Sequence, residues 1–471
     1  MAIPTDRSTP APGPFNLKRI LLVDDNETFL GALKIAFQRT GCVVTTATNG
    51  RVAVDLIGLE DFDAIVSDIH MPELNGIQLL HAVKKMRNTP VILTTGFAEL
   101  KETQEAHELG ADGFLAKPFR REDLMSLLMK VLKLEDPAPS TPDLDGEFSR
   151  IGIDEFISGS TIRYNIFVRV AKDNYVKVAH EGEDLAIERI RSYMEKKIRY
   201  LYLRKEDFRR YVGFNAQLAP MVKANQGVSK EKKLAFLRHT NEIILSQLYS
   251  DAIEEDSFQM ASTVVQNTTD LLSEASDVFM LLDALKNSGD DLHVHSVAVS
   301  LYSVLIAKQT GWTSQATLFK VAMGGLLHDI GLKEIEPEIV RKSREALSAA
   351  EVKIFETHPQ RGMELLSRVK SVPDDIAQIA YQHHENCLGT GYPKKLSRSR
   401  IHPMAKLVSV ADKFCELLLG HGGSERYTTK EAAERIAVLH ADELDNNFVL
   451  SLFQLLRLVP PKHIAPPGRI S

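Results

Sequence analysis

Residues 326–331 read LLHDIG and residues 383–385 read HHE, and these two runs decide the fold expected for the C-terminal half of the chain. Adjacent residues on a helix point about 100° apart, so a His-Asp or His-His doublet can face two metal ions or bridge them. The predicted metal ligands are Asp291, His295, His328, Asp329, His358, His383, His384 and Asp412. Imidazole and carboxylate groups suit iron, manganese, nickel or zinc, and sites with two metals hydrolyse phosphate esters.

Further short motifs surround the doublets in a fixed order. They are HS at His295-Ser296, HPQRG at 358–362, GTGYP at 389–393 and VAD at 410–412. Together with LLHDIG and HHE, this set resembles the HD-GYP family, phosphodiesterases that open the bacterial second messenger cyclic di-GMP. The resemblance implies an all-α HD-type metal-dependent phosphohydrolase domain over residues 289–460. It also implies two or three iron or manganese ions, cyclic di-GMP as substrate and Asp329 as a catalytic residue. Lys333, one residue beyond the family's lysine position, is the second catalytic candidate.

The chain departs from the family pattern at positions that handle substrate. Leu332 stands where the family has the lysine of HDxGK, and Lys333 follows one residue later. Asn386, Leu388 and Cys415 replace an arginine and two aspartates that are usual in the family. Other residues are therefore expected to bind the substrate. The candidates are Lys342 and Arg426, which can neutralise a phosphate, and Gly391, Tyr392 and Pro393 of the GTGYP loop.

Two functional hypotheses follow for this domain. In the first, it hydrolyses cyclic di-GMP, and the intact set of metal ligands favours this. In the second, it is a catalytically weak or inactive signalling adaptor, which the changes at Leu332, Asn386 and Leu388 favour. The adaptor would bind metal, cyclic di-GMP and partner proteins, among them a diguanylate cyclase at the GTGYP loop. Hydrolysis of a different phosphodiester is a third hypothesis.

The N-terminal region alternates short apolar runs with amphipathic segments. Arg19 to Asp25 read RILLVDD, and helical patterns cover Thr28–Arg39 and Gly76–Met86. The further apolar runs are 42–44, 64–66, 91–93 and 114–115. Strands that alternate with helices of this length predict an α/β doubly wound parallel sheet, which binds its ligands beyond the carboxyl ends of the strands.

Polar residues stand at these predicted strand ends. They are Asp24, Asp25, Asp68, Thr95 and Lys117. With the runs LLVDD, DIHMPELNG and AKPF, they resemble a two-component receiver domain over residues 17–134. The resemblance implies that a sensor histidine kinase is the partner, that Asp68 becomes an aspartyl phosphate, and that Phe114 is the aromatic switch. Clustered carboxylates repel each other unless a hard cation lies among them, so Asp24 and Asp25 are expected to hold Mg²⁺. Thr95 and Lys117 would contact the phosphoryl oxygens.

The remaining segments are expected to connect these two domains. Residues 135–147 are predicted to be a linker, and residues 148–214 a small α+β module with a hairpin turn at Lys172-Asp173-Asn174. This module is either a spacer or dimerisation unit or a ligand sensor. Its candidate contacts in the second case are Lys196, Lys197, Arg199, Arg204, Arg209 and Arg210. Residues 215–288 read as a helical connector that packs on the metal domain or pairs with a second copy, forming a homodimer.

Composition restricts the protein's class. The chain has 471 residues, of which 44% are hydrophobic and 25% charged, as expected for about three globular domains. No apolar run approaches the roughly 18 residues needed to span a bilayer, so no membrane insertion is expected. The three cysteines are widely spaced, which favours a cytoplasmic location. A net charge of −6 argues against nucleic-acid binding. Residues 1–16 are predicted to be a disordered tail and residues 461–471 a frayed one.

Overall fold

The computed structural model describes most of the chain. The described residues are 15, 17–95, 105–134, 144–153, 156, 161–183, 193–195, 198–273, 292–420 and 425–464. They belong to two compact units, Met1–Phe208 and Arg209–Ser471. Asp291, Lys196 and Lys197, together with most of the predicted tails and linker, lie outside the described residues.

The N-terminal part of the first unit is a parallel α/β sheet. Its strands are β1 (Arg19–Val23), β2 (Val43–Ala47), β3 (Ala64–Asp68), β4 (Val91–Thr95) and β5 (Gly113–Ala116). They pair in the order β2-β1-β3-β4-β5, all parallel, which confirms the predicted doubly wound sheet. Every residue of β3 and β4 is buried, which explains why these strands read as continuous apolar runs.

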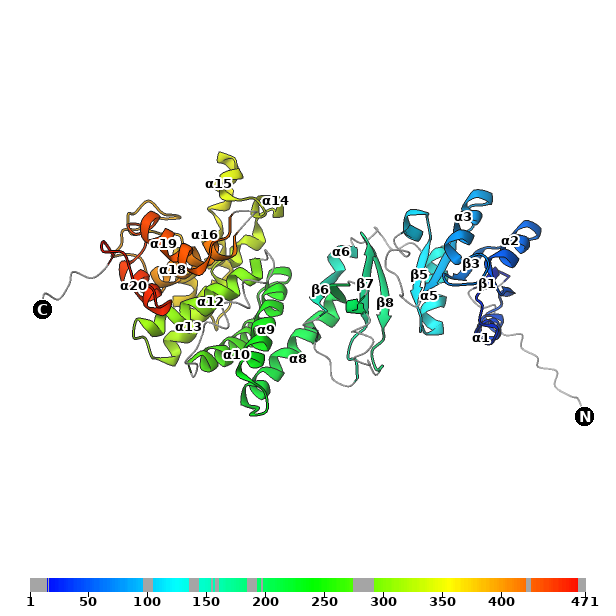
Figure 1. Ribbon diagram of the computed structural model, residues 1–471, viewed down its shortest axis with the longest axis horizontal. Helices are drawn as coiled ribbons and strands as arrows, with labels where there is room; N and C mark the ends of the chain where they lie inside the picture. The colour runs from blue at the N-terminus through cyan, green and yellow to red at the C-terminus, as the bar shows by residue number, and fades with distance from the viewer. Residues whose placement is uncertain are drawn as a thin grey trace, which may run out of the picture. The chain divides into compact units, whose positions relative to one another are not determined.

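Helices cover both faces of this sheet. The described ones are α1 (Glu27–Gln38), α2 (Gly50–Leu59), α3 (Gly76–Met86) and α5 (Arg121–Val131). Figure 1 shows α2 and α3 on one face and α1 and α5 on the other. Asn26, Asn49 and Asn75 each accept a backbone N–H at the start of α1, α2 and α3, which fixes where these helices begin.

The rest of the first unit is built around a four-stranded antiparallel sheet. Its elements are the short helix α6 (Leu144–Glu147) and the strands β6 (Phe148–Gly152), β7 (Ile166–Ala171), β8 (Asn174–Ala179) and β9 (Tyr200–Arg204), in the order β6-β9-β7-β8. Strands β7 and β8 form the predicted hairpin. Asp173 in its turn has a φ of 56°, a conformation that Asp tolerates better than most residues.

The second unit is helical. Its elements are α8 (Lys205–Ala224, which begins at the end of the first unit), α9 (Lys230–Ser250), α10 (Glu255–Ser273), α12 (Leu292–Gln309), α13 (Gln315–Leu327), η1 (Ile330–Glu334), α14 (Pro337–Val340), η2 (Arg344–Ala346), α15 (Ala349–Phe355), α16 (His358–Ser367), α17 (Asp374–Gln382), α18 (Pro403–Leu419), α19 (Thr429–Leu439) and α20 (Asn446–Leu455). The unit confirms the predicted all-α fold.

Helix α12 is the centre of this unit. It packs against α13, α18 and α20, and also against α9 and α10 from the preceding segment. It is therefore buried almost all round, as its largely apolar sequence requires. Gly325 of α13 lies directly on the α12 backbone, because an added Cβ would come 2.9 Å from the Ser300 Cα. Among the described residues, no helix combines the length and the apolar character that crossing a membrane requires.

Candidate metal centre and phosphoacceptor site

Helix ends bring the predicted ligands of the helical unit together. His328 ends α13, His358 begins α16, and His383 and His384 directly follow α17. Gly331 makes this convergence possible, since any Cβ there would lie 2.0 Å from the carbonyl oxygen of His358. The requirement for glycine in LLHDIG is thus steric: it lets two ligand-bearing segments touch backbone to backbone.

Backbone hydrogen bonds set the protonation of three of these histidines. The Nδ1 atoms of His328, His358 and His383 face the carbonyl oxygens of Gly325, Phe355 and Ala380 at 2.7 to 2.8 Å. A carbonyl oxygen only accepts, so each Nδ1 must carry the hydrogen and the Nε2 of a neutral ring presents a lone pair. These are the orientation and tautomer of a histidine that ligates a metal through Nε2.

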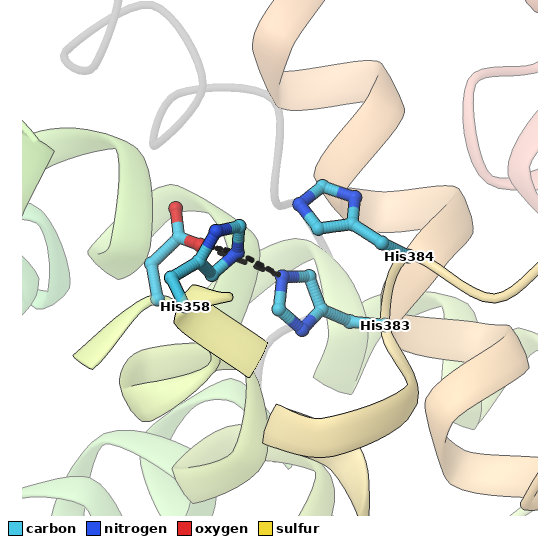
Figure 2. Close-up of side chains that lie close together, drawn as sticks. His358, His383 and His384 are labelled. Carbon is cyan, nitrogen blue, oxygen red and sulfur yellow. Dashed lines mark hydrogen bonds and ion pairs between the residues drawn. The ribbon is translucent and has the colours of Figure 1, made fainter. Parts of the chain in front are cut away.

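The three Nε2 atoms point at Asp329. The carboxylate oxygens of Asp329 lie 3.2 Å from the Nε2 of His358, 3.4 Å from that of His383 and 3.3 Å from that of His328. The Nε2 atoms of His358 and His383 face each other at 3.2 Å, as the dashed line in Figure 2 marks. Two lone pairs at this distance repel unless a proton or a metal cation lies between them.

The ligand atoms fall into two overlapping groups within 4.8 Å. Asp329, His358, His383 and His384 form one, and His295, His328 and Asp329 form the other. Asp329 belongs to both, so its two oxygens can serve two cations. Asp412 adjoins the second group, with its Oδ1 3.0 Å from the Nε2 of His295. The buried Nε2 of His328 has no hydrogen-bond partner, which fits a position reserved for a metal.

Burial and mutual charge shift the pKa values in this cluster. Burial alone would lower the pKa of His328, but Asp329 and Asp412 raise it to about 9. Burial opposes the charged form of Asp329, yet His328, His358 and His383 hold its pKa well below the usual range. Burial and the neighbouring imidazoles depress the pKa of His384 well below its usual value. Without a metal the cluster therefore favours a charged Asp329 carboxylate, a neutral His384 ring and a protonated His328, whose proton a bound metal ion would have to displace.

A cavity of about 380 Å³ opens over this cluster, bounded on one side by the GTGYP loop. The loop is held by Glu385, which is buried and accepts the backbone N–H groups of Lys394 and Leu396. Tyr392 stacks on His384, with ring centroids 4.6 Å apart and planes 30° apart. Gly391 and Tyr392 line the cavity as predicted residues of its rim, and Pro393 follows half-buried.

The altered family positions have structural partners. The Asn386 side chain bonds to the backbone N–H and hydroxyl of Thr390 and so closes the loop turn. Leu388 is exposed, and Cys415 is fully buried in α18, where burial raises the pKa of its thiol well above the usual value. None of these three side chains brings a charge to the cavity.

Lys333 faces away from the metal ligands. Its Nζ donates to the carbonyl oxygens of Leu248, at 2.6 Å, and Asp251, at the C-terminal end of α9. Burial lowers its pKa. Leu332 packs instead against Ile335 and Ile339 and borders the cavity. The lysine expected at the phosphate is thus used to cap a helix.

Cationic side chains from other segments reach the cavity. Those that line it in the described part of the chain are Lys342, Arg344 and Lys413. Lys342 had been predicted from the sequence. Arg426 is exposed and is not among the residues that line the cavity. Arg344 was missed, because only its contact with Tyr392, 48 residues away, distinguishes it from other surface arginines.

The first unit holds a second candidate site at the carboxyl ends of its strands. Oxygens of Asp24, Asp25 and Asp68 lie within 4.8 Å of one another. Lys117 Nζ lies 2.7 Å from Asp24 Oδ2 and 2.9 Å from Asp68 Oδ2. Burial raises the pKa of Asp68, although the ammonium of Lys117 opposes this. Thr95 is buried at the end of β4, and its carbonyl accepts the N–H of Lys117.

This constellation suits Mg²⁺ and a phosphoryl group. Three carboxylates in one place favour a hard, oxygen-preferring cation, and the nearby ammonium can neutralise a transferred phosphate. Phe114 is buried in β5, three residues before Lys117. The structure therefore brings the predicted nucleophile, the predicted metal ligands and the predicted lysine together. The ring of Phe114, the predicted switch residue, packs against His107.

Comparison with known proteins agrees with both predicted domain families. The response regulator receiver domain family matches residues 20–129, and the HD domain family matches residues 276–447. The N-terminal domain is thus a response regulator receiver domain. The helical domain is an HD domain. The chain therefore joins a receiver domain to an HD domain.

Individual relatives each match only part of the chain. A probable transcriptional regulator, ycf27 of Cyanophora paradoxa, is 32% identical over 138 residues, covering 29% of this chain and 58% of that protein. The cyclic di-GMP phosphodiesterase PA4108 of Pseudomonas aeruginosa is 28% identical over 188 residues, covering 40% of this chain and 42% of that protein. The HDG"Y"P protein Bd1817 of Bdellovibrio bacteriovorus has a similar fold, with a TM-score of 0.53 and 20% identity over 66% of this chain and all of Bd1817.

Proposed function

We propose that the protein is a response regulator whose HD domain hydrolyses a phosphodiester of cyclic di-GMP under control of Asp68 phosphorylation by a sensor histidine kinase. The observation that carries the proposal is the convergence of His328, His358 and His383 on Asp329. This convergence lies beneath a cavity edged by the GTGYP loop. The similarity to a relative named as a cyclic di-GMP phosphodiesterase supports the choice of substrate.

The residues have separate roles in this proposal. His295, His328, His358, His383, His384, Asp329 and Asp412 would hold two or more iron or manganese ions. Divalent cations at such a site polarise a phosphoryl oxygen and lower the pKa of water. Tyr392 fixes the plane of the His384 ring by stacking and forms one wall of the cavity. Hydrolysis forms a bond from water oxygen to phosphorus, breaks the bond to the 3′ oxygen and delivers a proton to that oxygen.

A specific observation favours the second candidate function, a signalling adaptor. Leu332 occupies the position of the family's lysine, and Lys333 is bonded to the end of α9, so neither places an ammonium group in the cavity. An oriented cation beside a reacting phosphate typically contributes a few kcal/mol, or about a hundredfold in rate. A protein without it would bind the dinucleotide and signal through a partner at the GTGYP loop.

Turnover of cyclic di-GMP by full-length protein decides between the two. The protein is reconstituted without oxygen with Fe²⁺ or Mn²⁺, and products are separated by chromatography. The proposal expects a linear dinucleotide or GMP, formed more slowly than by family members with HDxGK and not formed by Asp329→Ala. Binding of cyclic di-GMP without product, at full metal content, would establish the adaptor instead. Cleavage of bis(p-nitrophenyl) phosphate but not cyclic di-GMP would point to another phosphodiester.

A further inference from the structure

The cavity over the metal cluster needs a cation for an anionic substrate, and the described residues offer three. Lys413 lies in α18 and is held by an ion pair with Glu416, one turn away. Lys342, which follows α14, is paired with Glu351 of α15. Arg344 differs from both, because it also contacts a residue that stacks on a metal ligand.

The contacts of Arg344 lead directly to the metal cluster. Its Nη1 donates to the Tyr392 hydroxyl at 3.3 Å, and its guanidinium carbon lies 5.3 Å from the centre of the Tyr392 ring. Tyr392 in turn stacks on His384. The guanidinium is thus fixed beside the cavity wall next to a predicted ligand, although half of its side chain remains exposed.

We propose that Arg344 binds the phosphate of the substrate and replaces the lysine that Leu332 displaces; this rests on the proposed phosphodiesterase function. A guanidinium carries five N–H groups in a planar fork that matches two phosphate oxygens. Arg344 donates from Nη1 to Tyr392 and from Nη2 to Glu356, and a phosphate could accept from its Nε or from the second hydrogen of either terminal nitrogen. The bond to Tyr392 orients the fork before the substrate arrives.

Glu356 has a defined part in this arrangement. Its carboxylate pairs with Arg344 and therefore competes with an incoming anion for the same guanidinium. Neutralising Glu356 should free the Arg344 guanidinium for an anion and remove a charge that repels phosphate, so the affinity for phosphate should increase. The control carboxylate is Glu351 of α15, which pairs with Lys342 and also accepts the backbone N–H of Ser348.

Inorganic phosphate is the first probe, titrated by calorimetry into full-length, Mn²⁺-loaded protein. Arg344→Ala should weaken binding by about tenfold or more, the loss expected when a charged hydrogen bond is removed. Arg344→Lys should recover part of the affinity. Arg341→Ala, which removes the same charge from a position that does not line the cavity, should stay within about twofold. Equal metal content in all variants is checked by elemental analysis. Wild-type affinity in Arg344→Ala, or no phosphate binding in the wild type, would overturn the proposal.

The two carboxylates provide the second arm. Glu356→Gln should bind phosphate more tightly than wild type, and Glu351→Gln should be unchanged. The reverse pattern would assign the phosphate to Lys342 and overturn the role of Arg344. In turnover, Arg344→Ala should raise KM or lower kcat for both cyclic di-GMP and bis(p-nitrophenyl) phosphate. A protein that binds phosphate through Arg344 but never cleaves cyclic di-GMP would refute the proposed function and leave the anion site in place.

Discussion

Asp329 is the residue that joins the two groups of candidate metal ligands. Asp329→Asn keeps the shape of the side chain but removes the charge that balances two cations. We expect the purified variant to lose at least one transition metal per chain, because neutral imidazoles alone bind divalent ions more weakly than a set that includes a carboxylate. Elemental analysis of protein made with iron and manganese supplied measures this. Asp375→Asn, a change outside the cluster, should retain the wild-type content. Full metal content in Asp329→Asn would refute the shared-ligand arrangement.

The convergence of the His and Asp doublets could be predicted from the sequence, whereas the direction of Lys333 and the place of Arg344 could not. Doublets such as His328-Asp329 carry their chemistry in adjacent residues, so spacing alone points to a metal. The direction of Lys333 depends on the carbonyl groups of α9, more than 80 residues earlier. Arg344 depends on Glu356 and Tyr392, which lie 12 and 48 residues away. The shift of the lysine by one residue, from position 332 to Lys333, could not be interpreted from LLHDIGLK alone. Whether Lys333 reaches the cavity or the end of α9 depends on residues distant in the sequence.

At the scale of elements, two hydrogen bonds join the C-terminal end of α9 to the segment that contains His328 and Asp329. The Tyr249 hydroxyl donates to the carbonyl oxygen of Asp329 at 2.8 Å, and Lys333 donates back to the last turn of α9. Helix carbonyls at a C-terminus lack partners within the helix, so the ammonium satisfies groups that would otherwise be unpaired. The segment before the HD domain therefore positions Asp329, a candidate metal ligand.

Lys333→Met tests this helix-capping role against the catalytic role expected from the sequence. We predict a loss of about 1.5–3 kcal/mol in the free energy of unfolding, the typical worth of charged hydrogen bonds. Urea denaturation measures it, and Lys333→Arg should restore part of the loss. The kcat of the metal-loaded, folded variant should change less than its stability. A large fall in kcat with wild-type stability and metal content would instead make Lys333 catalytic.

The GTGYP loop gives a second prediction at this scale. Gly391 packs against the metal-ligand segment so closely that a Cβ would lie 2.4 Å from the His384 carbonyl oxygen. Gly391→Ala must therefore push the loop away from His384 and disturb the stack with Tyr392. We expect reduced metal content and slower phosphodiester cleavage. Gly389→Ala is no suitable control, because Gly389 has a φ of 72°. Ser397→Ala, an exposed change four residues beyond the loop, is used instead. Unchanged metal content in Gly391→Ala would contradict the steric argument.

Element boundaries were less predictable than the elements themselves. Strands β3 and β4 are buried on both faces, and the β7–β8 hairpin has a turn residue that accepts a positive φ, so both leave clear patterns. Helix α8 begins inside the residues expected for the α+β module and runs on into the expected connector. The boundary between the two compact units falls between Phe208 and Arg209, inside the first turns of this helix, where neither a proline nor a glycine interrupts the sequence.

At the scale of the whole molecule, Asp68 and the metal cluster lie in different compact units. Phosphorylation can then act on the HD domain only by changing an equilibrium in which both units take part. We predict that a small phosphodonor with Mg²⁺ labels Asp68 and changes the rate of cyclic di-GMP cleavage at least about twofold, a coupling of modest size. Radiolabelling and product formation are measured on the same full-length sample.

Variants separate labelling from response. Asp68→Asn should abolish both the label and the change in rate, because the amide is no nucleophile. Lys117→Ala should still accept the label but respond weakly, since its ammonium bonds both Asp24 and Asp68 and would bind the incoming phosphoryl group. Asp55→Asn, an exposed change on α2, should behave as wild type in both assays. A label that persists in Asp68→Asn would show that the nucleophile is another residue, and a labelled wild type with an unaltered rate would show that the two domains are not coupled.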